Sequence, residues 1–197
     1  MKVALGFKAH SGWAALVAVG RSDGGFRVID RRRIELADDD VAPRARQPYH
    51  AAVGLPTSTA TDVVARGVES ARRCAIREIR AAQNRSLESG HEIVACAVLV
   101  PAPMPDWSID EILAVHIRMH KAEGVLFPNT LVQAAAACGL NVVAIPERRL
   151  MEHAATSFAS SLSRLLREVE MLGKSVGAPW GKDQKSSALA AMIGLQP

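Results

Sequence analysis

The stretch Gly6-Phe-Lys-Ala-His-Ser-Gly12 gathers side chains that could bind an anion. Lys8 supplies a positive charge, and His10 and Ser11 add an imidazole and a hydroxyl group within three residues of it. Turns expose backbone N–H groups, and such groups together with a lysine can hold a phosphate. The stretch therefore predicts a phosphate or other anion site. The alternative is a hairpin whose polar side chains are simply solvated.

Two histidines have the spacing of a metal-binding pair. His116 and His120 are four residues apart in a stretch with helical spacing, and Glu123 follows on the same side. No glutamate follows His116 directly, so the zinc-protease pattern is missing. Because Ile109 and Leu113 continue the same stripe, we favour half-buried packing histidines here and keep a metal site as the alternative.

Four acidic residues are candidates for metal-dependent catalysis. Hard cations such as Mg²⁺ and Mn²⁺ take oxygen ligands, so displaced carboxylates could rebuild a site for them. The alternative, which we favour, is that these acids lie on the surface and cap helices. The candidates are Asp106, Asp110, Glu123 and Asp183.

A basic stripe runs along one predicted helix. Arg66, Arg73, Arg77 and Arg80 share one face, opposite the apolar face of that helix. Such a surface could bind a nucleic-acid backbone, with an affinity that falls steeply in salt. Glu69 can pair with Arg73 at the favourable four-residue offset, so a solvated helix face is the competing interpretation.

Composition indicates one globular domain spanning residues 1–197. The chain has 197 residues and a formal net charge of +4, a mild excess that is compatible with nucleic acid. Its three cysteines are widely spaced without a CxxC pair, which predicts reduced thiols in a cytoplasmic protein rather than disulfides or a zinc finger. No apolar run approaches a membrane span, so we expect no membrane partner.

Hydrophobic spacing places these residues on a defined series of elements. Three strands joined by short turns come first, a mixed loop covers residues 37–60, and strands then alternate with helices. This order predicts an α/β fold, with one mixed sheet of a three-strand antiparallel meander plus two further strands, and helices on both faces. The predicted strands are 2–7, 13–19, 26–36, 93–100 and 141–145, and the predicted helices are 62–86, 108–121, a helix ending at Gly139, 149–172 and 185–193.

This order of elements resembles that of the RNase H-like superfamily, and several stretches resemble RuvC-type Holliday junction resolvases more narrowly. The opening strand and turn resemble that family's Gly-Ile-Asp-Pro-Gly. The closing Ser187-Ala-Leu-Ala190 resembles its Asp-Ala-Leu-Ala. Between them, His120–Val125 resembles Gln-Ala-Arg-Gly-Val, Gly139–Val143 resembles Gly-Leu-Pro-Val, and Pro146 resembles the proline after that strand.

The resemblance implies carboxylates from the first strand, the fourth strand and the last helix around divalent metal ions. Here Phe7 or Lys8 stands at the first position, the fourth strand ends without a glutamate, and Ser187 stands for the last aspartate. A lysine in such a cluster repels Mg²⁺. We therefore expect a catalytically inactive nuclease that needs no cofactor, with a remnant anion site formed by Lys8, His10, Ser11, Gln184 and Ser187.

Three functions follow from these patterns. The first is a binding module for nucleic acid, an anionic ligand or a protein partner. The second is a divergent nuclease that uses Mg²⁺ or Mn²⁺ on structured DNA. The third is a homo-oligomer whose alanine-rich helices pack together.

Overall fold

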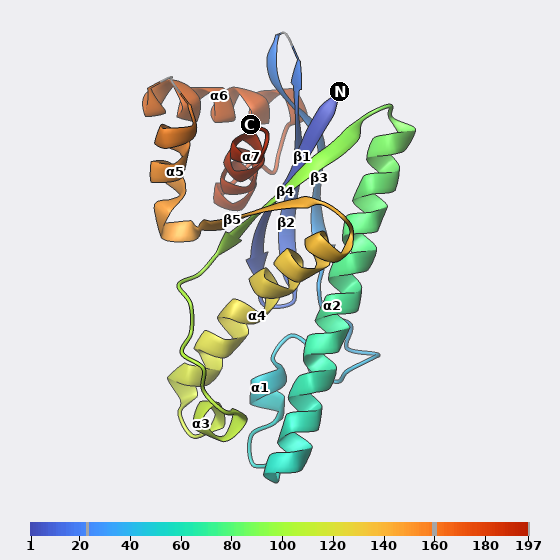
Figure 1. Cartoon of the computed structure of the whole chain (residues 1–197), viewed down its shortest axis with the longest axis vertical. Coiled ribbons are helices and arrows are strands. Elements are labelled where there is room, and N and C mark those ends of the chain that lie inside the picture. The colour runs from blue at the N-terminus through green and yellow to red at the C-terminus, as the bar shows by residue number, and fades with distance from the viewer. Residues whose placement is uncertain (23, 159–160, 197) are drawn as a thin grey trace.

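A mixed five-stranded sheet forms the centre of the computed structural model, which describes residues 1–22, 24–158 and 161–196 (Figure 1). The strand order is β3-β2-β1-β4-β5; β1, β2 and β3 are antiparallel neighbours, while β4 and β5 run parallel to β1. This confirms the predicted fold class. The strands are β1 (Lys2–His10), β2 (Trp13–Ser22), β3 (Gly25–Glu35), β4 (Glu92–Val100) and β5 (Asn141–Pro146).

Helices cover both faces of the sheet, and two separate cores result. Side chains alternate along β1, so that Leu5 and Phe7 pack under α2 and α4, while Ala4 packs under α5, α6 and α7. The helices on the first side are α2 (Thr57–Glu88) and α4 (His116–Ala137), and those on the second are α5 (Leu150–Ser157), α6 (Leu162–Val176) and α7 (Lys182–Gly194). Among the described residues, no helix combines the length and apolar character needed to cross a bilayer.

The long helix α2 buries most of the stripe that its spacing predicts. Ala71, Ala75 and Ile79 are fully buried against the sheet. The spacing of Val68 from Val64 and Ala71 predicts that it belongs to the same stripe, yet 36% of its surface is exposed. Gly67 is the buried residue at that level, because Pro48 approaches the helix there and leaves no room for a side chain.

Two strands differ from their predicted patterns. The apolar pattern of residues 141–145 is typical of a buried interior strand, yet this is the edge strand β5, which among the described residues pairs only with β4 and keeps Ala144 exposed. In β3 a bulge lies between Val28 and Asp30, so Val28 packs under α5–α7 whereas Ile34 packs under α2 and α4. In a regular strand the spacing of Val28 and Ile34 would put both side chains on one face, and the single extra residue moves one of them to the other face.

The helices also have different boundaries. The segment expected to be a loop contains α1 (Pro48–Ala51), and α2 begins at Thr57 rather than near residue 62. The predicted helix 108–121 is divided into α3 (Ile109–Leu113) and the start of α4, which continues past Pro128 without ending. The predicted helix 149–172 is two helices, α5 and α6, preceded by the 3₁₀ turn η1 (Glu147–Arg149).

An extension projects from the carboxyl end of β1. It consists of α1, α3 and the first turns of α2 and α4, at the bottom of the view in Figure 1. Two small apolar clusters hold it together: one centres on Ala52, Ala60 and Val64, the other on Ile112 and Met119. Tyr49 packs against both clusters and so joins them.

Candidate functional site at the carboxyl end of the sheet

The parallel strands β1, β4 and β5 end at one edge of the sheet, and polar side chains gather there. In open α/β sheets this edge is the usual place for ligands. Lys8 and His10 come from the end of β1, Glu147 follows β5, and Asp183 lies in the first turn of α7. Residues from distant parts of the sequence thus meet at this edge.

Lys8 forms an ion pair with Glu147. The Lys8 side chain is only 15% exposed, whereas that of Glu147 is 41% exposed. The ammonium group is therefore largely covered, and the carboxylate remains accessible to solvent. Phe7, the other sequence candidate for the first acidic position, is fully buried on the opposite face beneath α2 and α4. Lys8 is therefore the first-strand residue that faces the site.

His10 contacts Asp183, with 3.0 Å between Nε2 and Oδ2. Its ring stacks on the indole of Trp13, the ring centroids being 4.3 Å apart. The guanidinium of Arg33 covers the same indole, with Cζ 3.9 Å from the ring centroid. This stack holds the imidazole in place, and the contact between His10 and Asp183 joins the β1–β2 hairpin to the N-terminus of α7.

Helix α7 lies unusually close to β1 at Gly6. A Cβ atom at Gly6 would be 1.9 Å from the carbonyl oxygen of Ser187, so only glycine allows this approach. Ser187 itself is buried and donates a hydrogen bond to the Ala15 carbonyl oxygen at 3.1 Å. Gln184 accepts a hydrogen bond from the Gly181 N–H group at 2.9 Å and caps the helix. Ser11 is exposed in the hairpin turn.

A cleft of about 880 Å³ opens beside this edge. It lies between α4 on one side and the η1–α5 segment and α7 on the other, with Pro101 and Pro103 after β4 forming part of its wall. Among the described residues that line it, Glu147 alone is acidic, and Lys8 neutralises that charge. The cationic side chains that line it are Lys121, Arg148, Arg149 and Lys182.

The four acidic candidates lie apart and have separate surroundings. Asp183 contacts His10, and Asp110 accepts a hydrogen bond from the Thr57 hydroxyl group at 2.9 Å. Asp106 is exposed in the segment between β4 and α3. Glu123 is buried within the extension. Across residues 1–22, 24–158 and 161–196, the structure does not gather these carboxylates into one ligand group.

The arginines of α2 are exposed, as their spacing predicts. Arg66 and Arg73 border a shallow hollow of about 550 Å³, together with the acids Asp62 and Glu69. Glu69 forms the ion pair with Arg73 that the four-residue offset predicts, at 3.9 Å, and it also accepts two closer hydrogen bonds from Arg72, at 2.8 and 2.9 Å. The Arg72 hydrogen bond lowers the pKa of Glu69. Arg77 pairs with Glu78 at 3.2 Å, and Arg80 is also exposed.

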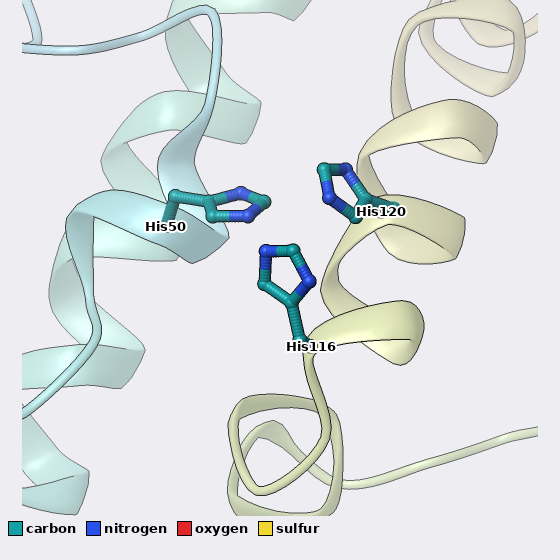
Figure 2. A group of neighbouring side chains, drawn as sticks. All are labelled: His50, His116 and His120. Carbon is teal, nitrogen blue, oxygen red and sulfur yellow. The ribbon is translucent and has the colours of Figure 1, made fainter.

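His116 and His120 are exposed, so the interpretation as half-buried packing histidines is wrong. They face a third imidazole, His50 of α1, which sequence spacing did not reveal (Figure 2). The ligand nitrogens of the three rings all lie within 4.8 Å of one another. Glu123 accepts a hydrogen bond from His50 Nδ1 at 2.9 Å. Burial, followed by the charge of Glu123, raises the pKa of the adjacent Tyr49.

The overall architecture has counterparts among solved structures. RuvC of Thermus thermophilus aligns over 97% of this chain and 92% of its own, with 11% identity and a TM-score of 0.48. Thermus thermophilus RuvC in complex with a Holliday junction substrate aligns over 97% and 91%, with 11% identity and a TM-score of 0.52. The fold is that of RuvC. No protein-family model and no curated protein matches the sequence.

Proposed function

We propose that this chain is a RuvC-like binding domain that holds a nucleic-acid backbone in the cleft at the carboxyl end of the sheet, without two-metal cleavage. The observation that carries the proposal is that Lys8 pairs with Glu147, the acid that lines the cleft, while the other charged residues that line it are cations. An ammonium group stands at the centre of the edge where the RuvC resemblance implies an aspartate.

The donor set at this edge does not fit a pair of Mg²⁺ ions. Such a pair needs several carboxylates free to bind metal, because hard cations take oxygen ligands and repel each other. Glu147 is engaged by Lys8, and Asp183 is engaged by His10. The Lys8 charge also opposes any divalent cation placed beside it.

The charge of the cleft fits a phosphate backbone. Lys121, Arg148 and Lys182 are exposed at its rim and, among the described residues, form no ion pair with an acid. Arg149 shares its charge with Glu152. Phosphate contacts of this kind release counterions and supply affinity without reading sequence. The RuvC structure that the chain matches at a TM-score of 0.52 contains a Holliday junction, so branched DNA is the first probe to use.

The test measures the anisotropy of a labelled four-way DNA junction in EDTA over a range of salt concentrations. Four phosphate contacts predict a slope of roughly −3 to −4 in log K against log salt. The double variant R148E/K182E is expected to reduce that slope by about 2 and the affinity on the order of 10–100-fold at moderate salt. The matched control R167E/K174E makes the same charge change on α6, away from the cleft, and retains binding.

Two results would overturn the proposal. Equal loss of affinity in the cleft variant and in the α6 control would mean that net charge alone drives binding. Cleavage of the junction with Mg²⁺ or Mn²⁺ that both EDTA and Asp183→Ala abolish would establish the divergent nuclease instead. The expected outcome is an intact junction under either metal.

A further inference from the structure

We infer that His50, His116 and His120 form a binding site for a borderline divalent metal ion, Zn²⁺ being the best match, with Glu123 as the residue that orients His50. The site lies in the extension formed by α1, α3 and the first turns of α2 and α4, and its ligands do not line the cleft at the end of the sheet. It does not depend on the nucleic-acid proposal.

The three imidazoles already converge. Their ring centroids are 4.4 to 5.3 Å apart, and Figure 2 shows the rings of α1 and α4 turned toward a common point. A tetrahedral zinc ion with Zn–N bonds of about 2.0–2.1 Å requires nitrogens roughly 3.3 Å apart. The ligand nitrogens here lie within 4.8 Å of one another, so small side-chain rotations complete the set.

Helical backbone segments hold the three histidines in position. His116 and His120 lie one turn apart at the start of α4, which places both on one face of that helix. His50 lies in the short helix α1, which begins at Pro48, and the contact of Pro48 with Gly67 holds α1 against α2. The ligands therefore come from rigid elements.

Glu123 provides the second, independent observation. Its side chain is only 3% exposed, and both carboxylate oxygens lie 2.9 Å from His50 Nδ1. One oxygen also accepts a hydrogen bond from the His50 backbone N–H at 3.2 Å. A carboxylate that accepts from Nδ1–H fixes the tautomer and leaves the Nε2 lone pair free for a metal. This is the arrangement that supports zinc-bound histidines.

Ligand chemistry selects the class of metal. Imidazole nitrogens suit Zn²⁺, Co²⁺, Ni²⁺ and Cu²⁺, whereas Mg²⁺ and Ca²⁺ take oxygen ligands. Among the described residues, neither His116 nor His120 forms an ion pair, so their nitrogens remain available. Three protein ligands leave a fourth position of a tetrahedral ion open to water. Because His116 and His120 are exposed, that position faces solvent.

The experiment titrates the untagged, metal-stripped chain with Zn²⁺ by calorimetry and with Co²⁺ by visible absorption. We expect one ion per chain, the intense absorption of four-coordinate Co²⁺, and no competition from Mg²⁺. His116→Ala and His120→Ala change exposed side chains, so the fold is retained. Each is expected to weaken binding on the order of 100-fold or more, and Glu123→Gln by about 10–100-fold. The control His153→Ala, on α5, retains full affinity.

Thermal unfolding gives a readout that does not depend on spectra. At a free Zn²⁺ concentration of 100 times Kd, the Tm is expected to rise by about 5–10 °C, and His120→Ala is expected to remove this shift. The proposal is overturned if Zn²⁺ fails to bind the parent chain or if His116→Ala and His120→Ala bind it as the parent does. Loss of binding in His153→Ala would also overturn it. Unchanged affinity in Glu123→Gln would remove the orienting role.

Discussion

Replacing Gly6 by alanine tests the close packing that brings α7 to the functional edge. The added Cβ would meet three backbone atoms of α7, the nearest being the Ser187 carbonyl oxygen at 1.9 Å. Backbone cannot rotate away as a side-chain end can. To restore the 3.4 Å at which ordinary contact begins, helix and strand must separate by about 1.5 Å.

The expected cost follows from what that separation disturbs. The buried face of α7 includes Ala188, Ala191 and Met192, which pack against β1, β2 and β4. Overpacking usually costs about 1–3 kcal/mol, and rigid surroundings place this case at the upper end or above it. We expect a loss of about 3 kcal/mol or more, which lowers the Tm by roughly 6–12 °C in a chain of this size.

The assay is urea unfolding, with Gly124→Ala as the matched control. Gly124 lies inside α4, and no atom of the described residues outside its own helix turn would lie within 4 Å of an added Cβ. Alanine there is therefore expected to raise stability by up to about 1 kcal/mol. The same glycine-to-alanine substitution is thus expected to lower the free energy of unfolding at Gly6 and to raise it at Gly124. A Gly6→Ala protein within about 1 kcal/mol of the parent would refute the packing of α7 against β1.

Two further predictions concern titratable groups. Hydrogen bonds from the Ser108 backbone and side chain lower the pKa of Glu111. The ionised carboxylate therefore stabilises the fold above the unfolded pKa of about 4.3, and this contribution is lost as the pH falls through the lower pKa of the folded state. Urea unfolding of Glu111→Ala is expected to show reduced stability at neutral pH and the stability of the parent in strong acid. Burial raises the pKa of the Cys96 thiol strongly, so little reactive thiolate forms there. Iodoacetamide at mildly alkaline pH is expected to modify the partly exposed Cys138 and to leave Cys96 unmodified until the protein is unfolded. Detection of labelled Cys96 in the native protein by mass spectrometry would contradict this.

The fold was largely predictable because strand and helix periods are local properties of the sequence. The apolar run 93–100 forms a strand whose residues 95–99 are buried, and the stripe of α2 from Ala71 to Ala82 is buried as expected. The errors arose where burial depends on distant neighbours. Residues 141–145 have the pattern of an interior strand, yet nothing in an apolar run of this length indicates that a strand pairs on one side only.

The candidate site was predictable only where its residues are close together in the sequence. The sequence placed Lys8 and His10 together beyond a strand that was expected to end at residue 7; β1 in fact continues to His10, and alternation along it puts both side chains on one face. Glu147 was missed as a partner of Lys8 because its role depends on β5 ending beside β4 and near β1, which is a property of the sheet order. His50 lies in a segment without periodicity, and only the packing of α1 brings it to His116.

Helix α4 contributes residues both to the cleft and to the histidine cluster. Lys121 and Gly124 line the cleft, while His120 and Glu123, their immediate neighbours in sequence, belong to the cluster in the extension. A helix turns or slides as a unit over so short a span, because its backbone hydrogen bonds resist local change. A displacement of these turns would therefore move Lys121 and Gly124 together with His120 and Glu123.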